Sequence, residues 1–88
     1  MNRYFDFKDI VDFLKTKDII EYKIVVNKFT FEFQSYKFII IANHSEDFYG
    51  IFDEYTIYFA GDVNGLLNLK STISFLDMVI TLIVKKKI

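Results

Sequence analysis

The chain has 88 residues, a formal net charge of −1 and no cysteine. This length supports one domain, residues 1–88, without room for a second core. The absence of cysteine excludes disulfides, thiol catalysis and thiolate metal sites, and the near-neutral charge argues against a general nucleic-acid-binding domain, which usually carries a basic excess.

The composition is biased towards the residues of AT-rich codons. Phe, Tyr, Met, Ile, Asn and Lys make up more than half of the chain, whereas Gly, Ala, Arg and Pro are scarce. The bias indicates an AT-rich genome, so the 11 Phe and 6 Tyr are weak evidence for a stacking surface. They can still build a dense core, because each buried aromatic side chain removes about 150–250 Å² from water.

The first predicted element is a helix over Phe7–Leu14. Apolar residues recur there at the i, i+3, i+4, i+7 spacing of one buried stripe, which includes Ile10 and Leu14. Asp6 precedes the stripe and can cap the helix.

From Ile19 the apolar period changes to two, which predicts strands. The segments Ile19–Val26 and Phe29–Gln34 form a predicted hairpin around a turn at Asn27-Lys28. A second turn at Gln34-Ser35 leads to a third strand, Tyr36–Ala42, which is apolar on both faces and therefore central in the sheet.

Residues 43–47 are all polar, which predicts a turn. Phe48–Phe52 and Tyr55–Ala60 then form a predicted hairpin about Asp53-Glu54. The glycine-containing segment Gly61–Gly65 is the strongest break in the chain and predicts a strand-to-helix turn.

A long helix is predicted over Leu69–Val84, because apolar residues recur there at spacings of four and three. The alternative is a final strand over Val79–Val84, which is rich in β-branched residues. No turn residue separates that segment from the helical pattern before it, so the pattern favours the helix.

These elements follow one another in the order α-β-β-β-β-β-α with short connections, which permit only antiparallel neighbours. The predicted fold is an α+β two-layer sandwich, in which an antiparallel sheet of four or five strands over Ile19–Ala60 has both helices on one face. The residues expected to be mostly buried are Ile10, Leu14, Ile24, Phe29, Phe31, Phe33 and Phe38.

The sequence carries weak signals for chemistry. His44, the only histidine, could act as a general base oriented by Asp47 or Glu46, but a polar loop explains it better. Asp53 and Glu54 are adjacent, so on a strand they would point to opposite faces instead of converging on a metal. We therefore predict no catalytic, cofactor-binding or metal-binding residue and no enzymatic activity.

The glycine segment Gly61–Gly65 resembles a phosphate or calcium loop only superficially, because it lacks the P-loop run and the closing Glu of an EF-hand.

Two features predict interaction surfaces. Residues 45–84 hold six acids against one base, which suggests an acidic surface for a basic partner; the residues assigned to it are Glu46, Asp47, Asp53, Glu54 and Asp62. The C-terminal helix is apolar around more than half its circumference, and surplus apolar surface tends to mark an interface. Its second stripe, Phe75, Val79 and Leu82, predicts self-association as a homodimer.

The predicted function is that of a small, non-enzymatic, cytoplasmic binding protein that occupies a macromolecular partner. The genomic bias suggests an inhibitor encoded by a phage or another mobile element, such as an anti-restriction or anti-CRISPR factor, or an immunity protein. One alternative is a nucleic-acid accessory protein that uses Lys23, Lys28 and Lys37 with sheet aromatics. The other is a small hydrolase or ligand-binding enzyme around His44.

Two other partners are less favoured by the pattern. Nucleic acid is disfavoured because the alternation places most aromatics and most charges on opposite faces of the predicted sheet. Membrane association would rest on Lys85–Lys87 as a basic flank. The residues Met1–Tyr4 run into charged positions without an apolar stretch, so no signal peptide is expected, and Ile73–Val84 is too short to span a bilayer.

Overall fold

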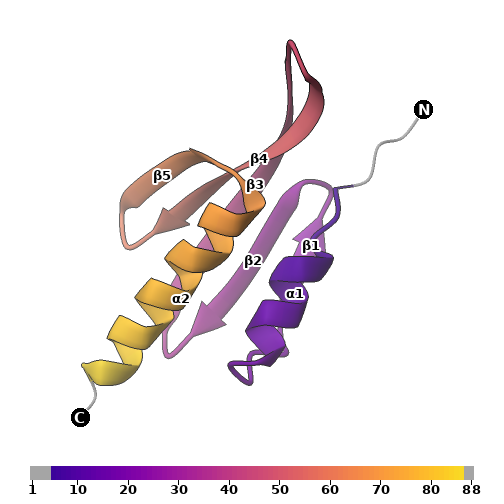
Figure 1. Ribbon diagram of the computed structural model, residues 1–88. Coiled ribbons are helices and arrows are strands. Elements are labelled where there is room, and N and C mark those ends of the chain that lie inside the picture. The colour runs from indigo at the N-terminus through magenta and orange to yellow at the C-terminus, as the bar shows by residue number, and fades with distance from the viewer. Residues whose placement is uncertain (1–4, 87–88) are drawn as a thin grey trace.

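The computed structural model describes residues 5–86 and contains a five-stranded antiparallel sheet with two helices on one face (Figure 1). Residues 1–4 and Lys87, which entered the expectations about a signal peptide and a basic flank, lie outside the described residues. The strands lie side by side in chain order, which confirms the predicted fold class. The elements are α1 Lys8–Lys15, β1 Lys23–Val25, β2 Lys28–Phe33, β3 Tyr36–Asp47, β4 Gly50–Phe59, β5 Asp62–Leu67 and α2 Leu69–Lys85.

In each helix a side chain at or just before the N-cap position accepts a hydrogen bond from an otherwise free amide of the first turn, although Phe7, the N-cap residue of α1, makes no such bond itself. The Asp6 carboxylate accepts a hydrogen bond from the backbone N–H of Lys8 at 2.8 Å. The Asn68 side chain accepts one from the N–H of Ser71 at 2.7 Å. α2 runs through residues 79–84 without a break, so the helix is confirmed and the alternative strand is wrong.

The core lies between the helices and the covered face of the sheet. Phe7, the residue before α1, has its ring 5.3 Å from that of Phe29 on β2. Phe31 stacks on Phe38 of β3 at 4.6 Å, so neighbouring strands interlock through aromatic rings. The largest side chains with no measurable exposure include Ile10, Leu14, Phe29, Phe38, Ile40, Ile57 and Leu76.

One burial prediction needs correction. Ile24 points to the covered face opposite Phe29 but is 46% exposed, and β1 is a three-residue edge strand. Phe33, at the end of β2, is partly buried and packs against the core. Residues 19–22 do not belong to a strand, although Ile19 is buried.

The two turns that flank β2 follow prediction closely. The Gln34-Ser35 turn is confirmed, with both residues at positive φ. The first turn is Val26-Asn27, one residue earlier than predicted, and Val26 has a φ of 55°. That conformation is unfavourable for a β-branched residue.

The second half of the sheet differs from prediction in three places. The segment 43–47, predicted as a polar turn, is the second half of β3. Asp53-Glu54 lies within β4 and is not a hairpin turn. The predicted break at Gly61–Gly65 largely forms β5, and the actual turn is Ala60-Gly61.

Because residues 43–47 and Asp53-Glu54 belong to strands, β3 and β4 form a long hairpin that extends beyond the rest of the sheet (Figure 1). Asn27 marks where β2 leaves β3: its carbonyl accepts from the N–H of Ala42 at 2.8 Å and its side-chain amide donates to the Ala42 carbonyl at 3.0 Å. On the other side, the last pairing of β4 with β5 is Tyr55 with Leu67. Within the described chain, residues 43–54 therefore pair only with each other, and we call them the arm.

Candidate functional site

The end of the arm is a two-residue turn made of Phe48 and Tyr49, between the paired residues Asp47 and Gly50. The Asp47 carboxylate accepts a hydrogen bond from the backbone N–H of Tyr49 at 2.7 Å, which fixes the turn. Gly50 has a φ of 134°, a conformation that residues with a side chain rarely adopt. The turn is thus defined by its own backbone and by one carboxylate.

The two aromatic side chains of this turn are almost completely exposed, Phe48 at 97% and Tyr49 at 94%. Their rings meet edge to face, with centroids 5.8 Å apart. The apolar surface continues into β4 through Ile51 and Phe52, both about half exposed. Glu46 and Asp47 are exposed beside it, and we call residues 46–52 the arm tip.

The base of the arm is held by a pair of polar side chains on the helix-covered side. His44 on β3 and Asp53 on β4 are cross-strand partners, and Nδ1 of His44 lies 2.5 Å from a carboxylate oxygen of Asp53. The Phe5 ring stacks on the imidazole at 4.2 Å with an interplanar angle of 14°. The segment before α1 therefore packs on the root of the arm.

The histidine is thus a strand residue, and the prediction that it lies in a loop is wrong. Its carboxylate partner is Asp53 and not Asp47 or Glu46, which lie at the hairpin end. A carboxylate that orients an imidazole is one part of a general-base site. The other part is a nitrogen open to a substrate, whereas Nε2 of His44 is buried and has no hydrogen-bond partner among the described residues. The geometry is that of a structural contact at the arm base.

Tyr55 lies one position beyond the arm, buried against the core. Its burial raises the pKa of the phenol, and the negative charge of Asp53 adds to the effect. The phenol therefore stays neutral and packs as an apolar group, with its ring 6.4 Å from that of Phe7.

The structure does not bring the five predicted acidic residues onto one surface. Glu46 and Asp47 are together at the arm tip. Asp53 and Glu54 point to opposite faces of β4, as adjacent strand residues must. Asp62 pairs with Phe59 at the other end of the sheet.

The face of the sheet opposite the helices is uncovered. Three lysines from three strands, Lys23, Lys28 and Lys37, line a hollow of about 300 Å³ there together with Val25 and Thr30. On the next strand, Tyr58 of β4 lies on the same face and is about half exposed. The lysines thus lie on the face opposite Phe29, Phe31 and Phe38, which agrees with the predicted segregation, and Tyr58 is an aromatic residue that shares their face.

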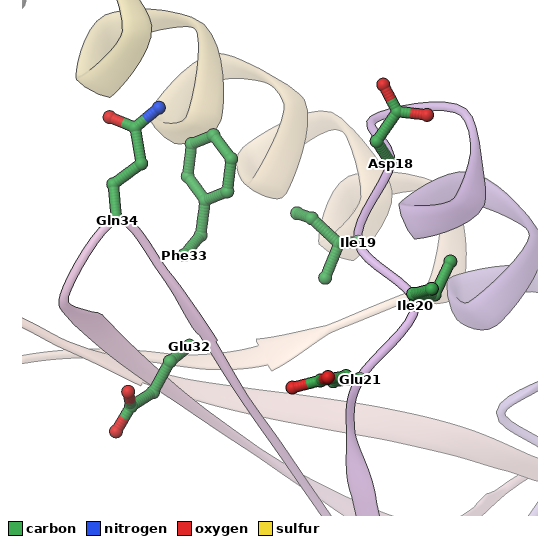
Figure 2. Close-up of a pocket in the computed structure, with 7 residues that line it drawn as sticks. All are labelled: Asp18, Ile19, Ile20, Glu21, Glu32, Phe33 and Gln34. Atoms are coloured by element: carbon green, nitrogen blue, oxygen red, sulfur yellow. The ribbon is translucent and has the colours of Figure 1, made fainter.

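Figure 2 shows a second hollow, of about 290 Å³, where residues 18–21 run past the end of β2. Carboxylates at its rim point away from one another in this view, those of Asp18 and Glu32 most clearly. Within residues 5–86 no group of three His, Asp or Glu side chains could hold a metal ion. We assign no ligand to this hollow.

The predicted self-association stripe on α2 is divided between core and surface. Val79 is only 8% exposed and packs with the core, and Phe75 is partly buried. Leu82 is about half exposed and lies beside Tyr36 and Phe59 around an apolar hollow of about 260 Å³. Self-association through this helix stays a prediction, with Leu82 as its exposed residue.

Sequence reasoning missed the arm tip, because it assigned Phe48 and Tyr49 to the start of a strand. The signal was present in the run from Asp47 to Gly50. In a tight turn, an Asp carboxylate typically accepts a hydrogen bond from the backbone N–H two residues later, and a Gly follows that residue. The long hydrophilic stretch before it concealed the strand that leads to this turn.

No α-helix within the described residues is both long and apolar enough to cross a membrane. No protein-family model, curated protein or solved structure matches the chain.

Proposed function

We propose that the protein works by binding another protein through the arm tip, without doing chemistry itself. The observation that carries the proposal is the exposure of Phe48 and Tyr49, at 97% and 94%, on the end of an arm whose turn is already formed. Aromatic side chains that protrude from a rigid element are typical anchors of protein interfaces.

The energetics favour such a role. Burial of the two rings in a partner would remove about 300–500 Å² from water. The ordering cost is low, because aromatic side chains have few rotatable bonds and the Asp47 hydrogen bond fixes the backbone beforehand. The exposed rings contribute nothing to the core of the free protein, so the chain carries them at the cost of solubility.

The charges at the tip define the class of partner. Glu46 and Asp47 flank the aromatic pair. Their carboxylates complement a partner surface with an apolar pocket and a basic rim. The same carboxylates would be repelled by the anionic head groups of a membrane surface.

The composition supports a narrower proposal about biological role. An inhibitor or immunity protein of a phage or another mobile element acts by occupying a surface of its target, for which a small rigid body with a protruding arm is suited. The AT-rich composition and the compact single domain support this class.

The experiment is affinity capture from the cells that encode the chain, with three baits. The baits are the wild type, the tip variant Phe48→Ser/Tyr49→Ser and the control Ile20→Ser/Val26→Ser, which removes exposed apolar side chains elsewhere. A partner that binds the arm tip is retained by the wild type and the control and is lost by the tip variant. Its direct affinity for the purified tip variant should fall at least about 30-fold, since an interface anchor contributes about 2 kcal/mol or more.

Two results would refute the proposal. One is a partner that the tip variant retains with unchanged affinity. The other is a loss of binding that the control variant reproduces, because the effect would then follow from general apolar exposure.

A further inference from the structure

The uncovered face of the sheet has a regular arrangement that the arm does not use. One row of cross-strand neighbours crosses all five strands; it consists of Lys23, Thr30, Ile39, Tyr58 and Val63. Lys28 belongs to the next row in one direction, opposite Ile41. Lys37 belongs to the next row in the other direction, opposite Glu32. Strands lie about 4.8 Å apart, so the row from Lys23 to Tyr58 spans about 14 Å.

The charges on this face are positive where the hollow lies. Its lining contains three lysines and no acid. None of these lysines is in a salt bridge within the described chain, which leaves their ammonium groups available. The acids on this side of the strands are Glu32 beside Lys37, Glu54 on β4 and Asp47 at the arm tip. Thr30 adds a hydroxyl in the middle of the lysines, a group that donates to phosphate oxygens.

We infer that this face binds single-stranded nucleic acid, with the backbone phosphates on Lys23, Lys28 and Lys37 and a base on Tyr58. Charge complementarity selects a polyanion, and the exposed ring at the end of the row selects one that has flat, unpaired bases to stack. A duplex keeps its bases stacked on one another, so it would use the lysines but not the tyrosine. This inference is independent of the proposed role of the arm.

The test is fluorescence anisotropy of a labelled oligothymidylate of about 15 nucleotides, with a duplex of the same length for comparison. Each phosphate contact with a single strand contributes about −0.7 to the slope of log affinity against log salt, so three lysines predict a slope of about −2. The protein should bind the single strand more tightly than the duplex at every salt concentration.

Two variants locate the site. Lys23→Gln/Lys28→Gln/Lys37→Gln should weaken binding at least 10-fold at about 50 mM salt and flatten the slope. The control Lys15→Gln/Lys70→Gln/Lys85→Gln makes the same change in net charge on the helices and should change affinity less than about threefold. Tyr58→Leu keeps an apolar side chain but removes the ring, and should cost about 10-fold, since base stacking is worth about 1–3 kcal/mol.

Several outcomes would overturn the inference. They are an absence of binding at low salt, equal losses in the two lysine variants, tighter binding of the duplex, and no effect of Tyr58→Leu. Inorganic polyphosphate provides a last control. If it competes with the oligonucleotide fully and Tyr58→Leu leaves the binding of both unchanged, the face is a general polyanion site and not one for single strands.

Discussion

Phe29 and Phe48 show how differently one residue type is used in the two parts of this sheet. Phe29 has no exposed surface and contacts the rings of Phe7, Tyr22 and Phe31. Phe48 is 97% exposed, and its ring pairs only with that of the adjacent Tyr49 among the described residues. The body of the sheet uses its aromatic residues for stability, whereas the arm presents them to solvent.

The difference matters because the composition alone cannot separate the two uses. Codon bias supplies phenylalanine throughout the chain, but only position decides whether a ring stabilises the fold or protrudes from it. The body has helices on one face, so alternate residues are buried. The arm has no neighbouring strand or helix beyond its base, so apolar residues there gain no burial from folding.

The largest expected effect is in the core. Phe29→Ala should lower the free energy of unfolding by about 3–5 kcal/mol, the usual cost of truncating a buried phenylalanine. Phe48→Ala is the matched change on the arm and should alter stability by less than about 0.5 kcal/mol. Urea denaturation followed by circular dichroism measures both. Similar losses for the two variants would show that the arm is part of the core.

A smaller effect is expected on α2. Val79→Asp should destabilise the fold by about 2–4 kcal/mol, because it places a carboxylate among core side chains. Leu82→Asp, three residues away at a half-exposed site, should leave stability within about 0.5 kcal/mol.

Leu82→Asp also tests self-association, because it is expected to leave the fold intact. Sedimentation velocity should show a wild-type dimer that Leu82→Asp converts to a folded monomer. A wild-type monomer at high micromolar concentration would refute the dimer and leave the hollow beside Leu82 unassigned.

The base of the arm is intermediate between the two regions. His44→Ala should cost about 1–2 kcal/mol, because it removes the stacking with Phe5 and leaves the half-buried Asp53 carboxylate without its partner. Hydrogen exchange should also become faster at arm amides. If His44→Ala left the melting temperature and arm exchange unchanged, the pair would not anchor the arm.

The smallest expected effect is a gain in stability. Val26→Gly should raise the free energy of unfolding by about 1 kcal/mol, since it relieves a β-branched residue at a φ of 55°. The neighbouring Val25→Gly, in regular β1, should lower it by about 0.5–1 kcal/mol. Thermal unfolding of both variants checks the sign. Two losses of equal size would contradict the positive φ at Val26.

The sequence predicted the body of the fold well, for a physical reason. On β2 one face is buried, and the period-two alternation of Phe29, Phe31 and Phe33 reports that burial. α2 shows the same reliability, because the apolar residues that recur at spacings of four and three include the buried Leu76, Ile80 and Ile83.

Prediction failed where burial does not control the pattern. Residues 43–47 are polar because the arm is largely solvated beyond the Phe5–His44 contact at its base, and the polar run predicted a turn. β5 contains Gly65 and Asn64 and pairs through an irregular register, which weakened its strand signal. The candidate site lies in this same region, so its tip was missed although the run from Asp47 to Gly50 carries a turn signal.

The most direct test of the central claim uses the absence of cysteine from the chain. A single thiol introduced as Phe48→Cys should react with a thiol reagent in the native protein as fast as it does in urea, because nothing covers the arm tip. Phe29→Cys should be protected by at least about 100-fold under the same conditions, since its thiol reacts only when the core opens. Strong protection at position 48, comparable to that at position 29, would mean that the tip is covered by the protein itself. It would contradict the account of the arm as a free binding element.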